Sequence, residues 1–352
     1  MRLSAGLLLL LFGLVAAAPA PNSGESNESK ESKESKESGE SDRLTITKHF
    51  YPDSFVVYKG KHDIVNILVP LNSLNFDEDS EDDDTSDDDN TTVFFVEADK
   101  DAKGKRIDRG LYVLKGGKAT KILDNGRDAA ASSDNSKEVF FGAQDGIYTY
   151  NQKDNTAVKY GSVTDSIIGI AKENITDAIY ILTEDNIVYK VTESGEKKEK
   201  VENVDGALEI VLDYSDNLYY YGADKQPYVL TADGVQKING LPEHPKSVRL
   251  VKPPFVIEEG VPFISDNEVY FIYPNGTSEV TGFDFKPNAK PTAYGIEATL
   301  IQYYGYNKKI YEYNILAILL NEAIDELKNF LETKSSTIQS MSTRSRSKMH
   351  GH

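Results

Sequence analysis

Apolar runs and polar turns alternate along residues 178–201, AIYILTEDNIVYKVTESGEKKEKV. An apolar run is followed by a polar turn, a second apolar run, a turn that contains glycine, and a charged third run. This pattern predicts three antiparallel strands joined by short turns. The second run contains a tyrosine directly after an apolar pair, Ile187-Val188-Tyr189, and this step recurs elsewhere in the chain.

The step from an apolar residue or a proline to a tyrosine occurs six times, at intervals of about 40 residues. The copies are Leu111-Tyr112, Ile147-Tyr148, Val188-Tyr189, Pro227-Tyr228, Val269-Tyr270 and Ile310-Tyr311. A period of this length with several short strands in each unit is typical of a β-propeller. The sequence therefore predicts an all-β fold, a six-bladed β-propeller over residues 44–314, with these tyrosines at equivalent positions in the third strand of each blade.

Each copy has similar neighbours, which gives four strands in each blade. An aromatic or aliphatic strand precedes the tyrosine, and a turn and a polar outer strand follow it. Aliphatic inner strands are expected at 64–69, 129–131, 166–171, 207–212 and 248–251. In the fifth unit, Ser265-Asp266-Asn267 is assigned to the turn between the second and third strands, because the alternative, one turn earlier, makes the tyrosine spacing irregular.

The sixth unit, residues 298–314, lacks an outer strand of its own. The alternating segment Leu44-Thr45-Ile46-Thr47 can supply one. A strand from the N-terminal part of the chain would close the ring without leaving an exposed sheet edge. We therefore predict pairing between residues 44–48 and the blade of Tyr311.

The first 18 residues have the pattern of a secretory signal peptide. Arg2 precedes a Leu-rich core at 7–11, and small residues follow at 15–18. The apolar run is shorter than the about 20 residues of a membrane span, so we expect a secreted, extracellular protein with no membrane partner. The chain has no Cys, so the fold must depend on its core rather than on disulfides.

Polar tails are expected at both ends of the propeller. Residues 19–43 should form a disordered tail that contains a Ser-x-Glu repeat. The repeat is either a solvated spacer or a phosphorylated, anionic tail, because Ser-x-Glu resembles the motif of secretory casein-type kinases. The candidate phosphorylation sites are Ser23, Ser26, Ser29, Ser32, Ser35 and Ser38. Residues 315–333 predict an amphipathic helix that packs on its own domain or makes a dimer contact, and residues 334–352 a disordered basic tail.

Two charged insertions interrupt the first blade. Residues 77–89 are almost entirely acidic and predict a solvated loop. The alternative is weak Ca²⁺ binding, although the spacing is not that of an EF-hand loop. Residues 99–109 are rich in Lys and Arg and predict a solvated hairpin extension. The net charge of −18 argues against nucleic acid as a partner.

Catalytic motifs are missing from the sequence, which contains no Cys nucleophile, HExxH, phosphate-binding loop or GxSxG. We therefore expect a non-enzymatic, monomeric protein without a cofactor. Six-bladed propellers of the gluconolactonase type hold a metal with acidic and Asn side chains of inner strands, and the candidates here are Asn66, Glu209 and Glu297. Glu209 is the weak candidate for a metal ligand, because a carboxylate in an apolar run must face the channel or find a partner.

Loops at the mouth of a propeller channel are the natural place for a ligand. The aromatic and basic residues expected on these loops are Arg127, Tyr160, His244, Phe283, Phe285, Tyr304 and Tyr306. Their rings and the guanidinium suit a flat, partly anionic ligand. The alternative is that Phe283 and Phe285 seal the sixth blade. Four sequons predict glycans at Asn27, Asn90, Asn174 and Asn275.

The pattern Phe140-Phe141-Gly142-x-x-Asp145-Gly146-Ile147-Tyr148-x-Tyr150, and a related one around Tyr180 and Tyr189, resembles the ommochrome-binding-protein-like secreted propellers of moths. The resemblance spans residues 44–314. It implies an extracellular carrier of a small aromatic pigment derived from tryptophan. The tails, the acidic loop and the terminal helix depart from it. The alternatives are a metal-dependent, lactonase-like hydrolase and an acidic extracellular matrix protein of silk, cuticle or eggshell.

Overall fold

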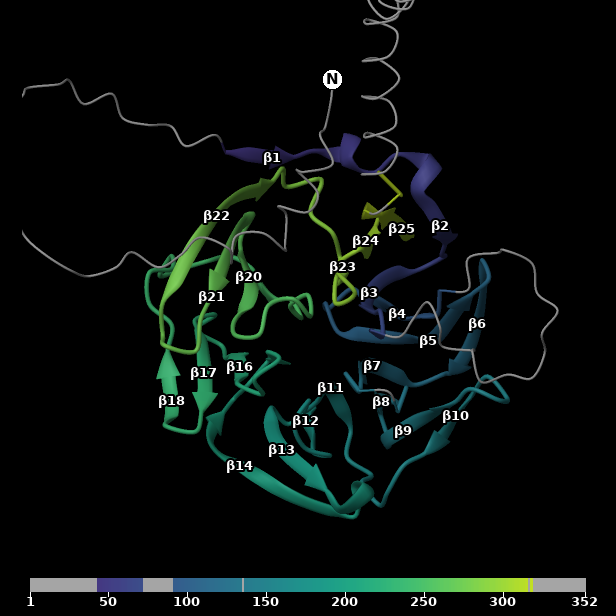
Figure 1. The fold of residues 1–352 in the computed structure, drawn as a ribbon, viewed down its shortest axis with the longest axis vertical. Helices are drawn as coiled ribbons and strands as arrows, with labels where there is room; N and C mark the ends of the chain where they lie inside the picture. Colours follow the sequence, from purple (N-terminus) through teal and green to yellow (C-terminus); the bar gives the residue numbers. More distant parts are fainter. Residues whose placement is uncertain (1–42, 72–90, 135, 316, 319–352) are drawn as a thin grey trace, which may run out of the picture.

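The computed structural model describes residues 43–71, 91–134, 136–315 and 317–318. These residues form a six-bladed β-propeller, and Figure 1 views it down the ring. The expected signal peptide, Ser-x-Glu tail, acidic loop and basic tail lie outside the described residues, as does nearly all of the expected helix 315–333. No helix in the described ranges is long and apolar enough to cross a membrane.

Each blade has four antiparallel strands whose inner strand faces the channel, and the fifth blade has one further strand at its outer edge. From inner to outer strand, the first blade is β3 (Asp63–Leu68), β4 (Val93–Lys100), β5 (Arg106–Lys115) and β6 (Lys118–Leu123), and the second is β7 (Gly126–Ala131), β8 (Val139–Ala143), β9 (Gly146–Asn151) and β10 (Thr156–Lys159). The third is β11 (Ile167–Lys172), β12 (Ile179–Thr183), β13 (Ile187–Thr192) and β14 (Lys197–Asp205), and the fourth is β15 (Glu209–Leu212), β16 (Leu218–Tyr221), β17 (Pro227–Thr231) and β18 (Gly234–Lys237). The fifth is β19 (Val248–Leu250), β20 (Val261–Ser265), β21 (Glu268–Ile272), β22 (Ser278–Phe285) and β1 (Leu44–Ile46), and the sixth is β23 (Ala293–Gly295), β24 (Ile301–Tyr306), β25 (Lys309–Asn314) and β2 (Val56–Lys59).

The tyrosine repeat marks the third strand of every blade, as predicted. Each repeat tyrosine lies opposite a large apolar or aromatic residue of the second strand. These pairs are Phe95 with Tyr112, Phe141 with Tyr148, Ile181 with Tyr189, Tyr220 with Tyr228, Phe263 with Tyr270 and Tyr304 with Tyr311. Asp266 and Asn267 form the turn between β20 and β21, so the register chosen for the fifth blade is confirmed.

The ring closes with a strand from the N-terminal part of the chain, but the predicted strand was wrong. The outer strand of the sixth blade is β2, residues 56–59, which pairs antiparallel with β25. Residues 44–46 instead form β1, which runs parallel to β22 at the outer edge of the fifth blade. Two short 3-10 helices, η2 (Lys48–Phe50) and η3 (Asp53–Phe55), connect β1 and β2. Residues 47–55 cross the seam between the fifth and sixth blades. One continuous segment, residues 44–59, therefore supplies the outermost strand of both blades.

Aromatic side chains fill the seam between the fifth and sixth blades. Phe50 stacks on Tyr313, with ring centroids 4.7 Å apart, and meets Tyr304 edge-on at 5.7 Å. Tyr51 stacks on Tyr306 at 4.1 Å and donates a hydrogen bond to the carbonyl of Ala289. We call this buried group, together with Phe283, Phe285, Tyr294 and Tyr311, the seam cluster.

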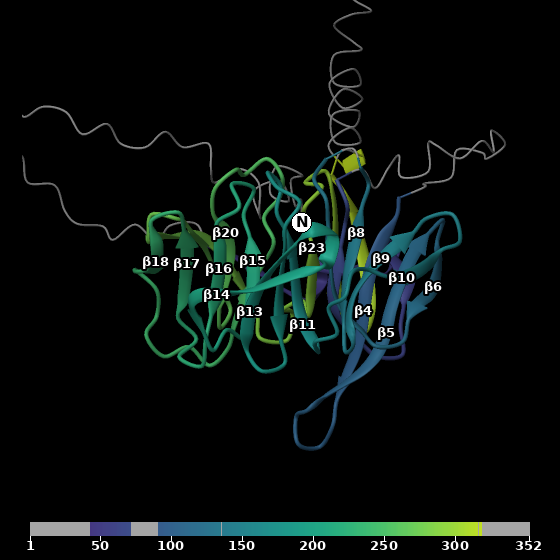
Figure 2. The same ribbon diagram turned by 90° about the horizontal axis from the view of Figure 1, so that it is seen from below.

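The hairpin of β4 and β5 extends beyond the ring, as the basic insertion predicts (Figure 2). Its turn is organised by Asp101, whose carboxylate accepts hydrogen bonds from the N–H groups of Lys103 and Lys105 at 2.8 Å each. Nearer the ring, Arg109 pairs with Asp99 at 2.8 Å. The hairpin therefore brings charged side chains to one end of the channel.

Candidate functional site

The inner strands surround a central cavity of about 700 Å³. Much of its wall is aliphatic, with residues such as Val65, Ile168 and Val211. Charged side chains reach the same wall from every blade. They are Asp63, Asp99, Lys100, Arg106, Arg127, Asp128, Lys172, Glu209, Arg249, Lys252, Lys290 and Glu297.

Asp128 of β7 connects three blades in the middle of the channel. Its carboxylate accepts hydrogen bonds from the side-chain amide of Asn66 on β3 and from the N–H of Ile170 on β11, the latter at 2.7 Å. Burial raises the pKa of Asp128 to about 6, although the backbone N–H groups of Ile170 and Ala129 favour its charged form. Asn66, a predicted metal-ligand candidate, thus serves as a partner of Asp128.

Glu209 of β15 lines the channel and has protein partners on both carboxylate oxygens. One oxygen accepts the N–H of Leu250 at 2.9 Å, and the other lies 3.1 Å from Nε of Arg249. Arg249 also donates from Nη2 to the carbonyl of Val65 in the first blade at 3.0 Å. Burial raises the pKa of Glu209, and the Arg249 charge opposes that shift. Across the described part of the chain, no group of three or more His, Cys, Asp or Glu side chains is arranged to hold a metal ion.

Glu297 and Lys252 lie at the end of the channel where the inner strands finish. Each follows its inner strand by two residues, Lys252 after β19 and Glu297 after β23. The Glu297 side chain is buried, and its Oε2 atom has no hydrogen-bond partner among the residues that the structure describes. Burial raises the pKa of Glu297 to about 7, with Lys252 opposing the shift. Burial likewise lowers the pKa of Lys252, and Glu297 opposes that change.

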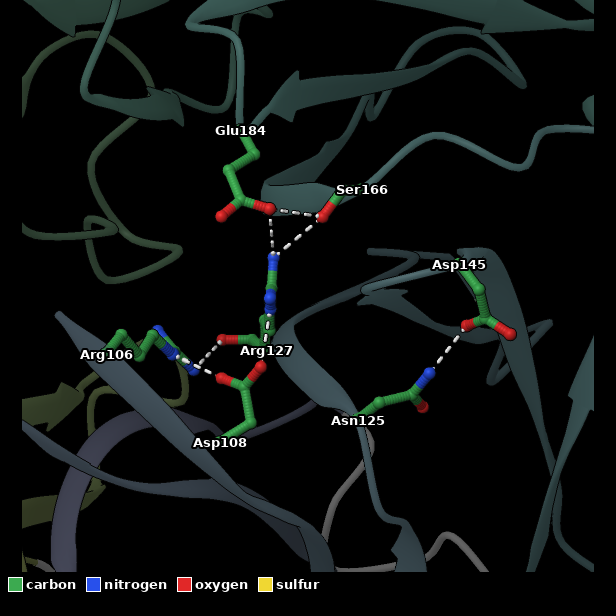
Figure 3. Close-up of polar contacts among 7 residues, drawn as sticks. All are labelled: Arg106, Asp108, Asn125, Arg127, Asp145, Ser166 and Glu184. Atoms are coloured by element: carbon green, nitrogen blue, oxygen red, sulfur yellow. Dashed lines mark hydrogen bonds and ion pairs between the residues drawn. The ribbon is translucent and has the colours of Figure 1, made fainter.

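A polar network occupies the opposite end of the channel (Figure 3). Asp108 of β5 accepts hydrogen bonds from Nε of Arg106 and Nε of Arg127, each at 2.7 Å. Nη1 of Arg127 also donates hydrogen bonds to Ser166 at 2.9 Å and Glu184 at 3.4 Å, both on the third blade. Only 10% of the Arg127 side chain and 14% of the Asp108 side chain are exposed, so the centre of this network of three blades is buried, whereas the Glu184 side chain at its edge is 51% exposed.

The structure does not bring the predicted ligand residues together. Arg127 lines the cavity. Tyr160 packs edge-on against Phe140 at 5.0 Å, and His244 lies exposed on the loop between β18 and β19. Phe283 and Tyr304 are buried in the seam cluster and do not line the channel, although Tyr294 of the same cluster does.

The remaining two mouth residues, Phe285 and Tyr306, also belong to the seam. Phe285 is buried there, and the Tyr306 hydroxyl donates to the carbonyl of Asn288 at 2.7 Å. The four seam aromatics were assigned to loops, but β22 continues to Phe285 and β24 to Tyr306. The alternative interpretation, in which Phe283 and Phe285 seal the sixth blade, describes their positions better than a ligand site does. They seal the seam between the fifth and sixth blades.

Asp128, Arg249 and Lys252 are among the charged residues of the channel that were not selected from the sequence. The signal that selected Glu209, a charge within an aliphatic inner strand, also applies to Arg249 in Val248-Arg249-Leu250. It applies more weakly to Asp128, which precedes a run of alanines. Lys252 follows its strand and carries no comparable signal.

Two of the four sequons lie in the described residues, in different environments. Asn275 is exposed, and its Oδ1 accepts hydrogen bonds from the N–H and hydroxyl of Thr277 at 3.1 and 2.6 Å. The side-chain amide of Asn174 donates to the carbonyl of Asp213 at 3.3 Å, so a glycan there would replace this contact. We predict that peptide mapping of secreted protein finds Asn275 largely glycosylated and Asn174 largely free. A glycan carried mainly at Asn174 would contradict this prediction.

Comparisons with known proteins add the following. No family model matches the sequence, and no curated protein matches it either. An auxiliary nutrient binding protein from Bacteroides thetaiotaomicron is similar over 63% of this chain and 65% of its own, which is less than two thirds, with a TM-score of 0.45 and 10% identity. The WD40 repeats of RRP9 are similar over 73% of this chain and 78% of theirs, with a TM-score of 0.48 and 12% identity. Likenesses of this size carry no argument about ligand or partner.

Proposed function

We propose that this protein is a secreted, non-enzymatic binding protein that holds a small ligand in the propeller channel. The observation that carries the proposal is the cavity of about 700 Å³ between the inner strands. Small-molecule sites are typically concave, of about 300–1,000 Å³, and mostly apolar with a few placed polar groups. The cavity has a volume in this range, and its aliphatic wall carries charged groups at the middle and both ends, more of them than is typical.

The aromatic side chains that line the cavity are not the ones that the sequence predicts. Tyr221 and Tyr294 line the cavity, whereas the predicted aromatics do not. Their rings offer faces or edges for stacking, worth about 1 kcal/mol per contact. An ommochrome-type pigment, which the resemblance of the sequence implies, therefore remains a suitable probe.

Binding without turnover is the simpler use of this channel. Glu209, on which the hydrolase alternative relies, accepts a hydrogen bond on one oxygen and forms an ion pair with Arg249 through the other. A catalytic role would require these contacts to break. Secretion is supported by the signal-peptide pattern of residues 1–18. The matrix-protein alternative depends on the tails, which lie outside the described residues.

The proposal is tested by identifying the natural ligand and by filling the channel with a larger side chain. Small molecules released by denaturing protein from its natural source are identified by mass spectrometry, and these and an ommochrome pigment are titrated by calorimetry. Val65→Trp places an indole at the cavity wall and should weaken binding about tenfold or more. Val158→Trp, on an exposed site of outer strand β10, is the matched control and should bind like wild type. Equal binding by both variants, or release of no small molecule, would contradict the proposal.

A further inference from the structure

Lys252 and Glu297 occupy corresponding positions in adjacent blades, and both line the channel cavity. The inner strands of a propeller run in the same direction, so both side chains lie at the end where these strands finish. The segment between β19 and β20 passes over this end. It is held by hydrogen bonds from the N–H of Phe255 to the carbonyl of Glu297 at 3.0 Å and from the N–H of Gly260 to Asp213 at 2.9 Å.

One oxygen of the Glu297 carboxylate lacks a hydrogen-bond donor among the described residues. Glu297 is 4% exposed, and within the described part of the chain its Oε2 atom is buried without a hydrogen-bond partner. A buried carboxylate oxygen is normally satisfied by a protein donor, an ordered water or a ligand. Asp128 and Glu209, the other channel carboxylates described above, each accept a hydrogen bond from a backbone N–H of a neighbouring blade, whereas the N–H groups near the Glu297 carboxylate are those of Ile296 and of Glu297 itself.

Lys252 is a basic residue that lines the same cavity from the adjacent blade. Its side chain is partly exposed, and among the described residues it donates no hydrogen bond and joins no ion pair. The charge of Glu297 nevertheless influences Lys252, and that of Lys252 influences Glu297. The two groups therefore line one cavity without direct contact, and the charge of each favours the charged form of the other.

We propose that this end of the channel binds a small zwitterion, a molecule with an ammonium group and a carboxylate, whose ammonium donates to Glu297 and whose carboxylate accepts from Lys252. A zwitterion satisfies both charged groups at once, whereas an anion or a cation alone leaves one of them buried and unpaired. This inference rests on the proposed function of the channel and adds the chemical class of the ligand.

Three probes that share one phenyl ring test the inference by calorimetry on the full-length secreted protein. They are L-phenylalanine, which has both charges, phenethylamine, which has only the ammonium, and 3-phenylpropionate, which has only the carboxylate. L-Phenylalanine should bind about tenfold more tightly than either analogue, because charge-assisted hydrogen bonds contribute to its affinity at both ends. Similar affinity for all three probes would overturn the proposal.

Single substitutions assign the two ends of the probe. Glu297→Gln should weaken L-phenylalanine about tenfold and leave 3-phenylpropionate unchanged. Lys252→Met should weaken L-phenylalanine and 3-phenylpropionate and leave phenethylamine unchanged. Glu258→Gln, on an exposed site of the same segment, is the matched control and should have no effect. Loss of L-phenylalanine binding in the control as well as in Glu297→Gln would place the ammonium elsewhere and overturn the assignment.

The two proposals fail in different ways. If none of the probes binds, but Val65→Trp abolishes binding of a natural ligand that lacks an ammonium and carboxylate pair, the zwitterion inference is wrong and the binding function stands. In that case water alone fills the space between Lys252 and Glu297. If Val65→Trp leaves all binding unchanged, the proposed function itself is wrong.

Discussion

Tyr304→Ala is expected to lower the free energy of unfolding by about 3–5 kcal/mol, as other large-to-small changes of buried aromatic residues do. The Tyr304 side chain is 1% exposed. Its ring lies edge-on to Phe50 and Tyr313, with centroids 5.7 and 5.4 Å away, and its hydroxyl donates to Gln302 at 2.8 Å. The substitution therefore leaves a cavity in the seam cluster and a buried amide oxygen without its donor.

Denaturant unfolding followed by circular dichroism measures this change. Phe255→Ala is the matched control, since its ring is 48% exposed and the substitution should alter stability by less than about 0.5 kcal/mol. If Tyr304→Ala were as stable as the control variant, the seam cluster would not hold the fifth and sixth blades together as described.

Asp108→Asn is expected to lower the free energy of unfolding by about 3 kcal/mol, because it removes the charge that two guanidinium groups share. Arg106 and Arg127 both donate to this carboxylate at 2.7 Å, and the amide of Asn keeps the shape but not the charge. Arg127 would retain Ser166 and Glu184, which limits the loss.

Asp145→Asn is the matched control for that experiment. Asp145 accepts a hydrogen bond from Asn125 at 2.7 Å near the same end of the propeller (Figure 3), but its side chain is 55% exposed. Exposed polar contacts of this kind contribute less than about 1 kcal/mol. Equal losses in the two variants, measured by denaturant unfolding, would show that burial of the Asp108 network does not determine its strength.

The fold was predictable because the repeat of an apolar residue and a tyrosine reports a property of each blade separately. Tyr189 and Tyr270 occupy the same strand of their blades because each packs beside its own second strand, which lies close in sequence. Ring closure depends on a contact between distant segments. Residues 44–46 and 56–59 both have the composition of a short strand, and periodicity does not distinguish which of them pairs with β25.

The site was less predictable, for two physical reasons. Tyr304 and Phe283 were assigned to the loops at the mouth of the channel, yet pairing with neighbouring strands extends β24 and β22 through them. Lys252 and Glu297 are separated by a whole blade in sequence, and only the ring places them at one cavity. The charge of Glu209 within an apolar strand was informative, because such a group must face the channel or a partner.

The pairing of β2 with β25 has a consequence for synthesis on the ribosome. Val56 lies opposite Tyr311, so the outer strand of the last blade leaves the ribosome before any blade is complete, and its partner leaves after all the others. Until then the sixth blade has no outer strand and the β2 segment has no sheet. Unpaired strand edges favour association with other chains, and contacts between distant segments form slowly. The interval between the emergence of residue 59 and that of residue 314 is therefore the period in which the nascent chain is most exposed to aggregation and most dependent on chaperones.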